Sequence, residues 1–412
     1  MKIKRKQPLI RFKGFNEDWE EKKLGDIGKT FNGLSGKTKK DFGHGEARYI
    51  TYMNVNRNAI SDIDGLDKIE IDNSQNEVKY GDIFFTTSSE TPEEVGLSSV
   101  WLHNVDNIYL NSFCFGYRLT EYINPLFLAY LFRSNYFRSK AILLAQGISR
   151  YNISKKQLMK ITISISEKSE QAKIGNLINN LDKLISLQEQ KLELLEQVKK
   201  GLLQKLFPKK GSKIPEIRFR GFEGEWGEKK LGEIADIKGG GTPSTKNSDY
   251  WNGNINWYSP VEIDNQIFIS SSQKKITEEG LKNSSAKILP IGTVLFTSRA
   301  GIGKTAILKE PGSTNQGFQS IVPKKSQLDS YFIYSRTKEL KRYAETVGAG
   351  STFLEVSGRQ MKKMKIKIPE IYDEQIKISN VYKNLDELIS SQEQKLQQLQ
   401  AMKQSLLQQM FI

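Results

Sequence analysis

Short stretches rich in serine, threonine, lysine and arginine recur along the chain, and proteins use these side chains to contact nucleic acid. Arginine and lysine donate hydrogen bonds to guanine, serine and threonine bond to several base edges, and backbone amides bind phosphates. The stretches in the second half are residues 239–246 with 250–251, 297–305 and 348–352, and their counterparts in the first half are residues 37–40, 86–89 and 147–151. Loops of this composition also occur on ordinary protein surfaces, so composition leaves both interpretations open.

From these stretches we predict two sets of DNA-contacting side chains, one in each half of the chain. The first set is Lys37, Thr38, Lys39, Lys40, Thr87, Ser88, Ser89, Arg150 and Tyr151. The second set is Thr242, Ser244, Thr245, Lys246, Tyr250, Ser298, Arg299, Lys304, Ser351 and Thr352.

Three motifs are similar to catalytic or nucleotide-binding signatures, and each lacks a residue that the chemistry needs. Residues 298–305 have the spacing of a phosphate-cradling loop, but Ser298 stands where the pattern needs glycine. Residues 124–127 are similar to the motif with which amino-methyltransferases hold a target base, but they contain one proline instead of two. Glu216 with residues 228–230 has nuclease-like spacing, but the first half has leucine at the position that matches Glu216. No carboxylate pair stands out for acid–base chemistry, so we predict a protein that is not an enzyme.

The composition favours a polyanionic partner and excludes several kinds of site. Among 412 residues, 62 are lysine or arginine and 47 are aspartate or glutamate, which gives a formal net charge of +15. Nucleic acid is the usual partner of such a chain, although a basic surface without a partner has the same composition. Cys114 is the one cysteine and the histidines are His44 and His103, so neither a disulfide framework nor a zinc cluster can form. We expect no metal and no cofactor on this chain.

The sequence shows no segment that would enter a membrane. Residues 1–6 are basic but no apolar region follows them, and the longest apolar run, around residues 126–132, is far too short for a membrane span. We therefore expect a soluble, cytoplasmic protein.

The longest internal repeat must position the polar loops. Residues 170–207 recur as residues 374–411 at a constant shift of 204, with 22 of 38 positions identical. Their apolar residues alternate spacings of three and four, which is the seam of a coiled coil. About 40 residues at 1.5 Å rise form a helix roughly 60 Å long. Because the two seams are equally long, we predict that the helices pair with each other; two helices inside one globular core are the alternative.

The predicted seam has apolar and polar members. The apolar members are Ile178, Leu181, Ile185, Leu192, Leu195, Leu202, Leu385, Ile389, Leu396, Leu399 and Leu406. The polar members are Gln188, Lys199, Gln392 and Lys403. Polar seam residues cost stability but restrict the register of pairing, and we predict that role for these four.

A second repeat opens each half of the chain. Residues 8–25 return as residues 215–232, shifted by 207 with 12 of 18 positions matching; we term these the leading segments. Their shared aromatic residues include Trp19 and Trp226. We expect these rings to pack against a core, and stacking on bases is the alternative.

Between the leading segment and the long helix, each half has a body of mixed strands and helices. Strands are predicted at residues 48–53, 78–87, 108–119, 255–258 and 293–297. Helices are predicted from Asn124 toward Ala145 and from Ser330 to Thr346. Alternating apolar residues at 161–165 and 364–368 predict a closing strand in each body. Lys363, Lys365 and Lys367 would lie on the outer face of the second closing strand, where they either contact phosphate or protect the strand edge.

The fold class that follows is α+β, with a pseudo-twofold internal repeat. Two α/β bodies are separated by two long helices that pair as an antiparallel coiled coil, because the chain must cross a whole body between the helices. The expected domains are residues 1–166 and 208–369 for the bodies and residues 167–207 and 370–412 for the helical spacers.

This architecture resembles the DNA-sequence specificity subunit of type I restriction–modification systems over essentially the whole chain. The residues that carry the resemblance are 238–244 with Tyr250 and Trp251, 297–304, 315–317, 374–376 and 396–411. The first body has Tyr80–Ile83 and Asn111–Phe113 but neither the Thr-Pro-Ser stretch nor the arginine of residues 297–304.

The resemblance implies a noncatalytic subunit. Each body would be a target-recognition domain for one half of a bipartite, asymmetric double-stranded DNA site, and the helices would set the spacing and dock two modification (methyltransferase) subunits. S-adenosylmethionine, ATP and Mg²⁺ would be bound by those partners and by the restriction (translocase and endonuclease) subunits. The alternative is a stand-alone two-domain DNA-binding or scaffold protein without catalytic partners. A self-sufficient methyltransferase–nuclease is disfavoured because the catalytic motifs are incomplete.

Overall fold

The chain folds into two compact units. The computed structural model describes residues 6–264, 266–299, 301–349 and 354–412. Unit 1 contains Met1–Gln190 with Glu393–Ile412, and unit 2 contains Lys191–Gln392. Each unit therefore holds one body, the first part of one long helix and the last part of the other.

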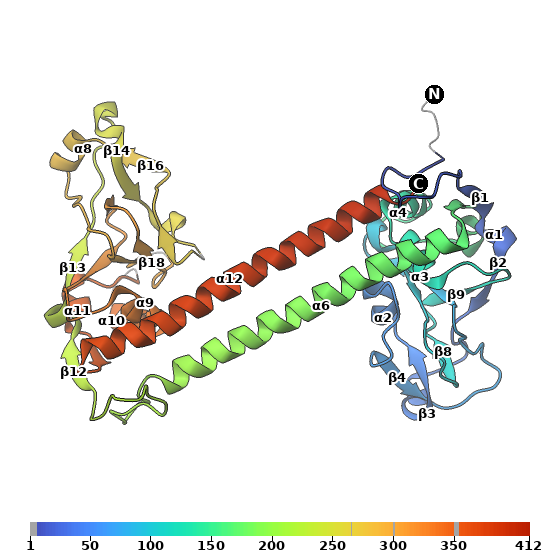
Figure 1. Cartoon of the computed structure of the whole chain (residues 1–412), viewed down its shortest axis with the longest axis horizontal. Coiled ribbons are helices and arrows are strands. Elements are labelled where there is room, and N and C mark those ends of the chain that lie inside the picture. The colour runs from blue at the N-terminus through green and yellow to red at the C-terminus, as the bar shows by residue number, and fades with distance from the viewer. Residues whose placement is uncertain (1–5, 265, 300, 350–353) are drawn as a thin grey trace. The chain divides into compact units, whose positions relative to one another are not determined.

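The two repeated segments form the long helices α6 (Lys168–Lys205) and α12 (Tyr372–Gln409), each of 38 residues (Figure 1). Pro208 follows the end of α6 and cannot continue a helix. The predicted helices are confirmed. No helix in the described part of the chain is both long and apolar enough to span a membrane.

Within each unit, the end of one long helix lies beside the start of the other. In unit 1, Lys403 near the end of α12 pairs with Asp182 near the start of α6. In unit 2, Lys199 near the end of α6 pairs with Asp386 near the start of α12. The helix segments in each unit are thus antiparallel, as predicted. All eleven predicted apolar seam residues are buried or half-buried.

The body of unit 1 is built from two main sheets. The four-stranded sheet has the order β2-β9-β5-β7, and the three-stranded sheet has the order β4-β3-β8. Two further strand pairs are β1-β11 and β10-β6. The strands are β1 (Glu20–Lys23), β2 (Gly28–Asn32), β3 (Phe42–Ile50), β4 (Leu66–Ile69), β5 (Ile83–Thr86), β6 (Ser88–Ser89), β7 (Ser98–Val100), β8 (Ile108–Leu110), β9 (Cys114–Leu119), β10 (Tyr151–Asn152) and β11 (Thr162–Ile165).

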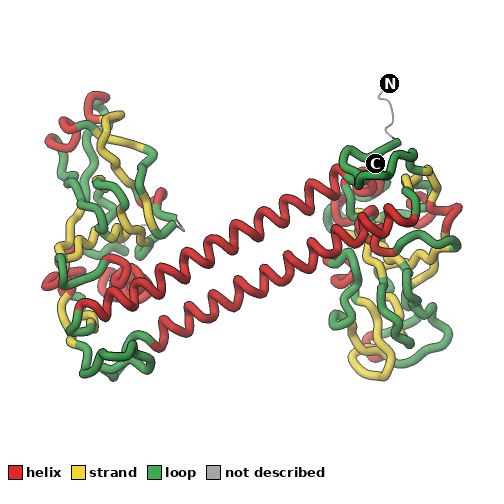
Figure 2. Tube along the Cα trace, in the orientation of Figure 1, coloured by secondary structure: helices red, strands yellow, loops and turns green. Residues whose placement is uncertain are grey.

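The body of unit 2 repeats the order of the main strands and adds β15 at the edge of its larger sheet. Its sheets are β13-β20-β17-β18-β15, β16-β14-β19 and β12-β21, and Figure 2 shows the strands linked by many loops. The strands are β12 (Gly227–Lys230), β13 (Ala235–Gly239), β14 (Trp251–Tyr258), β15 (Phe268–Ile269), β16 (Lys274–Ile276), β17 (Val294–Phe296), β18 (Thr305–Leu308), β19 (Gly312–Thr314), β20 (Gln319–Pro323) and β21 (Lys365–Ile368). The internal repeat of the sequence is therefore also a repeat of topology.

Short helices complete both bodies. The α-helices are α1 (Leu24–Ile27), α2 (Tyr52–Arg57), α3 (Pro125–Leu131), α4 (Asn135–Ile142), α5 (Lys155–Leu158), α7 (Leu231–Ile234), α8 (Glu278–Lys282), α9 (Ser330–Ser335), α10 (Thr337–Gly348) and α11 (Gly358–Lys363). The 3-10 helices are η1 (Lys39–Asp41), η2 (Pro92–Glu94), η3 (Ser248–Tyr250) and η4 (Pro260–Glu262).

Three of the predicted elements are interrupted. The predicted helix from Asn124 divides into α3 and α4 because Ser134 caps a new helix, its Oγ accepting a hydrogen bond from Phe137 N. The helix predicted from Ser330 likewise divides into α9 and α10. The predicted strand 108–119 divides into β8 and β9 at a turn that begins with Asn111. A prediction of one continuous element was wrong at each of these places.

The leading segments pack against the start of the long helix in their own unit. Arg11 donates to both carboxylate oxygens of Glu170 at 2.7 and 3.0 Å, and Glu170 is fully buried. In unit 2, Arg218 makes the same forked contact with Glu374, at 2.8 Å to each oxygen. Trp19 and Trp226 are 4% and 1% exposed. Packing of these aromatics against a core is therefore confirmed, and base stacking is not open to the two tryptophans.

The lysines of the closing strand are largely occupied by local partners. Lys365 pairs with Glu228 on the neighbouring strand at 2.9 Å, and Lys367 Nζ donates to two backbone carbonyls of residues 209 and 212. These contacts favour a structural role at the strand edge over a phosphate contact.

Candidate nucleic-acid interface

An asparagine turn occupies the same place in both bodies. Asn111 follows β8, its backbone N–H donates to Ile50 O at 3.1 Å, and its Oδ1 accepts from Phe113 N at 2.9 Å. Asn315 follows β19, its N–H donates to Tyr258 O at 3.0 Å, and its Oδ1 accepts from the N–H two residues on, that of Gly317, at 2.8 Å. The two turns are equivalent. Each follows a strand that pairs in parallel with the long strand of its sheet, β8 with β3 in unit 1 and β19 with β14 in unit 2.

Two further loops attach to this turn by matching backbone hydrogen bonds. In unit 1, Thr87 N donates to Phe113 O at 3.1 Å and Ile153 N donates to Thr87 O at 2.9 Å. In unit 2, Ser298 N donates to Gly317 O at 2.8 Å and Val356 N donates to Ser298 O at 3.1 Å. The loops after β5 and β17 therefore sit between the asparagine turn and a third loop in both units.

Glycine lets a fourth loop approach the turn closely. A Cβ added to Gly33 would lie 2.0 Å from Asn111 O, and one added to Gly240 would lie 2.1 Å from Asn315 O. Such distances exclude any side chain at either position. The glycines after Lys238, which the sequence presents as a flexible stretch, thus include one that is required for close packing.

We term the resulting assemblies the loop clusters. The loop cluster of unit 1 comprises residues 33–40, 87–97, 111–113 and 149–153, and that of unit 2 comprises residues 240–246, 297–299, 301–304, 315–317 and 354–356. The polar stretches that the sequence separates by up to about a hundred residues are brought together in each unit. Ser351 and Thr352, two of the predicted contacts, lie outside the described residues.

The lysines predicted in unit 1 differ in availability. Lys37 pairs with Asp72 at 2.7 Å, which raises the pKa of the lysine and lowers the pKa of the aspartate. Thr38 N and Oγ1 donate to Asp41 Oδ2 at 2.6 and 2.8 Å, so this threonine caps η1, and these bonds lower the pKa of Asp41. Lys39 and Lys40 are exposed, which makes them the cations of this loop that face solvent.

Three of the other predicted residues of unit 1 line a cavity of about 540 Å³. Ser88 and Ser89 form β6, pair with β10 and are largely buried, whereas Arg150 is exposed and Tyr151 is half-buried. Thr87 Oγ1 donates to Phe113 O at 2.7 Å. The cavity is lined by Tyr52, Ser88, Ser89, Glu90, Glu94, Phe113, Ser149 and Arg150. Three predicted residues thus line one site together with two aromatic rings and two carboxylates.

In unit 2 the predicted residues near the glycine stretch form a mixed surface. Thr242 Oγ1 donates to Gln316 Oε1 at 2.5 Å, and Ser244 O accepts from Trp251 Nε1 at 3.1 Å. Thr245 and Lys246 are exposed, and Tyr250 is half-buried in η3.

The loop after β17 separates buried from accessible residues. Ser298 is fully buried, and its backbone N–H and carbonyl both bond to neighbouring loops, so its side chain is not accessible at the surface. The predicted DNA contact of Ser298 assumes an accessible side chain, and the structure buries it. Arg299 is about half-exposed and pairs with Glu355 at 2.8 Å, and Lys304 is exposed. These two cations are the accessible ones of the loop.

The structure adds residues that the sequence did not single out. Phe113 is 57% exposed at the position that matches Gly317, and Glu94 lies opposite Ser89 in the unit 1 cavity. Gln316 lies beside Thr242. The recurring Asn-x-Phe and Asn-Gln-Gly sequences are the signal that points to Phe113 and Gln316, whereas Glu94 has no sequence signal because its place depends on a hairpin.

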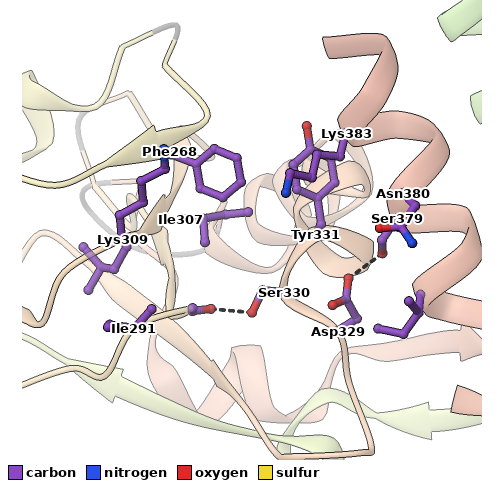
Figure 3. Close-up of a pocket in the computed structure, with 13 residues that line it drawn as sticks. Phe268, Ile291, Ile307, Lys309, Asp329, Ser330, Tyr331, Ser379, Asn380 and Lys383 are labelled. Atoms are coloured by element: carbon purple, nitrogen blue, oxygen red, sulfur yellow. Dashed lines mark hydrogen bonds between the residues drawn. The ribbon is translucent and has the colours of Figure 1, made fainter. Parts of the chain in front are cut away.

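Unit 2 also contains a cavity, which lies at the start of β17, at the end of the strand away from the loop cluster (Figure 3). Its volume is about 330 Å³. Phe268, Ile307 and Tyr331 supply apolar surface, and Lys309 and Lys383 add positive charge (Figure 3). Asn380 and Lys383 come from α12, so this cavity lies between the body and the long helix and is separate from the loop cluster.

The described residues contain no group of histidine, cysteine, aspartate and glutamate that could hold a metal ion. The stretch with phosphate-loop spacing connects β17 to β18 and forms a hairpin, so the helix N-terminus that a phosphate cradle uses does not follow it.

Comparisons with known proteins identify the family. The description "type I restriction modification DNA specificity domain" belongs to a family whose profile matches residues 16–197 and again residues 223–401. The chain belongs to this family. The specificity domain is thus present twice, once for each half of the repeat, and family membership places the chain among specificity subunits and not among catalytic ones.

Individual relatives agree with the family. The type I restriction enzyme MjaIX specificity subunit of Methanocaldococcus jannaschii is 39% identical over 191 residues, which cover 46% of this chain and 44% of that subunit. The putative MjaX specificity subunit of the same organism is 26% identical over 415 residues, which cover 95% of this chain and 92% of that subunit. The S subunit of a type I restriction–modification system from M. genitalium has the same fold, with a TM-score of 0.63 at 16% identity over 98% of this chain and 99% of that one.

Proposed function

We propose that this specificity-domain chain is the subunit that selects the DNA sequence in a type I restriction–modification complex. The loop cluster of each unit recognises one half of a bipartite double-stranded site. The observation that carries the proposal is that one framework of hydrogen bonds supports different side chains in the two units. Phe113 stands in unit 1 where unit 2 has Gly317, and Ser88 stands where unit 2 has Arg299.

A constant framework with variable side chains suits sequence recognition. Base edges are distinguished by the donors, acceptors and methyl groups that side chains meet in the major groove, whereas backbone amides and exposed lysines bind phosphate without regard to sequence. Two dissimilar loop clusters therefore imply two dissimilar half-sites and an asymmetric target, because the symmetry of a protein and that of its site go together. The net charge of +15 supplies the attraction to DNA.

Two copies of one partner would dock, one on each unit, on a surface that recurs in both units. Four exposed residues of α6 recur on α12 at the same shift: Lys173, Asn176, Asn180 and Leu184 in unit 1 and Lys377, Asn380, Asn384 and Leu388 in unit 2. They lie on one helical face. Lys173 and Lys377 each lie over a phenylalanine of the leading segment, at 4.7 and 4.9 Å from the ring centroids. Leu184 and Leu388 are 50% and 40% exposed. We assign this shared face to two modification subunits.

In this proposal, partner subunits carry out methylation and DNA cleavage. The modification subunits would use S-adenosylmethionine, and the restriction subunits would use ATP and Mg²⁺. The complex would work in the cytoplasm, where its DNA is accessible.

One experiment tests sequence selection directly. The chain is co-expressed with its modification subunit in a methylation-free host, and modified adenines are mapped by long-read sequencing. The expected result is one bipartite motif that is lost when the body of either unit is deleted. A stable complex that methylates no motif would contradict the proposal and favour a plain DNA-binding or scaffold protein.

A second experiment tests the docking face. Native mass spectrometry of the complex should show two modification subunits for the unchanged chain, one for Leu184→Asp and none for the double variant with Leu388→Asp. Leu187→Asp is the matched control, because Leu187 is 61% exposed on the same helix but serine stands at its repeat position. Two bound copies in the double variant would place the partners elsewhere.

A further inference from the structure

Equivalent hairpins, β5–β7 in unit 1 and β17–β18 in unit 2, carry opposite charge in the two loop clusters. Thr86 Oγ1 donates to Glu94 O at 3.0 Å and accepts from Leu97 N at 3.0 Å. Thr297 Oγ1 donates to Gly301 O at 2.8 Å and accepts from Lys304 N at 2.9 Å. Glu94 therefore corresponds to Gly301, and Leu97 corresponds to Lys304. Unit 2 adds Arg299 to this hairpin, whereas unit 1 adds Glu90 and Glu93.

Glu94 is held in place before any DNA binds. The guanidinium of Arg138 donates to the carbonyls of Glu93, Val95 and Gly96, each at 2.7 Å. Arg138 is 8% exposed, and burial lowers its pKa to about 10, so it remains charged at neutral pH. Ser89 Oγ donates to Glu94 Oε2 at 2.6 Å. The backbone and one carboxylate oxygen of Glu94 are thus fixed, which leaves Oε1 to accept a bond from a ligand in the cavity.

The carboxylate of Glu94 restricts which groups of a DNA base can bond in the cavity. An ionised carboxylate is an acceptor only, so its partner must donate. In the major groove of DNA the donors are the N4 amino group of cytosine and the N6 amino group of adenine. Adenine presents the acceptor N7 beside its amino group, which repels a carboxylate, whereas glutamate paired with cytosine N4 is an established match. Cytosine is therefore the base that Glu94 favours.

A contact with phosphate does not explain a glutamate at position 94. A carboxylate beside a phosphate backbone is repelled, and Arg150, on the rim of the same cavity, is the group suited to phosphate or guanine. A fixed acidic residue on a DNA-facing surface therefore points to a base edge.

We propose that Glu94 is a specificity-determining residue that accepts a hydrogen bond from the amino group of a cytosine in the half-site recognised by unit 1. This inference rests on the proposed function. It assigns an acceptor to the unit 1 hairpin, whereas the equivalent hairpin of unit 2 offers the donors Arg299 and Lys304.

The test maps methylated motifs for the complex that contains Glu94→Gln. Glutamine pairs with adenine through both a donor and an acceptor, so the preference should shift from cytosine to adenine at one position, with a change of about tenfold or more. Arg299→Gln identifies the half-site of unit 2, which Glu94→Gln should leave unchanged. Glu93→Gln is the matched control, since the Glu93 side chain lies on the same loop but does not line the cavity.

The outcomes separate the two hypotheses. If the unchanged complex yields no bipartite motif, the proposed function fails. If it yields a motif and Glu94→Gln strengthens binding uniformly at all positions, the carboxylate only repels phosphate and the inference is overturned. Glu94→Asp keeps the acceptor but shortens the side chain, so it should weaken methylation while keeping cytosine; a change of base with this variant would also overturn the inference.

Discussion

Lys199 and Asp386 form an ion pair that joins the two long helices in unit 2, and a tyrosine of the body contacts the same carboxylate. The Tyr331 hydroxyl donates to Asp386. In unit 1, Lys403 Nζ lies 2.5 Å from Asp182 Oδ1, and Tyr130 Oη donates to Asp182 at 3.0 Å. The lysines and aspartates are repeat positions, but Tyr331 is two residues after the capping residue of its helix and Tyr130 is six residues after its own. Both units therefore connect two helices and a body through one carboxylate.

Removing Lys199 should weaken unit 2. Asp386 is 8% exposed and Tyr331 contributes one hydrogen bond to it, so Lys199→Met leaves a charge that is poorly compensated. We expect a loss on the order of 2 kcal/mol in unfolding free energy. Urea unfolding followed by far-UV circular dichroism measures it, with the exposed neighbour substitution Lys200→Met as the control. Equal stability of both variants would show that the pair contributes nothing.

Removing Arg218 should release the leading segment of unit 2. Glu374 is 1% exposed, and Arg218→Met leaves its carboxylate without the forked partner. Unpairing a buried charge costs about 3–5 kcal/mol, so residues near 218 should become sensitive to limited proteolysis. Adding Glu374→Gln should recover part of this loss. Lys does not reproduce the fork of arginine, so Arg218→Lys should be intermediate; full stability of Arg218→Met would contradict the prediction.

The equivalent substitution in unit 1 should cost less. Trp19 Nε1 donates to Glu170 at 3.1 Å, so Arg11→Met leaves one bond to the buried carboxylate. Trp226 Nε1 has no hydrogen-bond partner in the described part of the chain. In the same proteolysis experiment, Arg11→Met should therefore increase cleavage near residue 11 less than Arg218→Met increases cleavage near residue 218.

Cys114 should make unit 1 sensitive to high pH. Burial raises the pKa of its thiol to about 12 from an ordinary value near 9.0. The folded state therefore binds the proton more tightly than the unfolded state, so this stabilisation is complete below pH 9 and is lost as pH rises toward 12. The difference in unfolding free energy between the native chain and Cys114→Ala should shrink over that window, by at most about 1.4 kcal/mol per pH unit. A constant difference would show that the thiolate is tolerated.

The sequence predicted long-range features better than local ones. The shift of 204 residues and the heptad seam identified α6 and α12, and the body that the chain must cross between them identified their antiparallel pairing. The break between α3 and α4 was missed because Ser134 looks like any helical serine until its hydroxyl caps the next helix. The position of the loops was predicted by composition, but whether a side chain faces solvent depends on strand register.

Ser298 illustrates that dependence. It lies two residues after β17 and has the small polar side chain expected of a surface loop, yet its backbone is bonded on both sides and its side chain is fully buried, whereas the next residue, Arg299, is about half-exposed. The place of Glu94 was missed for a different reason, since an acidic residue in a basic chain gives no sign that it lines a cavity. The Arg138 bonds to the carbonyls of Glu93, Val95 and Gly96 hold its loop there.

The length of the long helices should determine the distance between the half-sites. Inserting one heptad after Gln190 in α6 and another after Gln394 in α12 lengthens each helix between its two Lys–Asp pairs and keeps the seam in phase. Seven residues add about 10 Å, which equals roughly three base pairs of B-DNA. Methylation mapping should show the unrecognised gap widened by that amount, with both half-sites unchanged. Insertion into α6 alone is the control, because it mismatches the seams and should lower stability without a defined wider gap. An unchanged gap in the double insertion would show that the helices do not set the spacing.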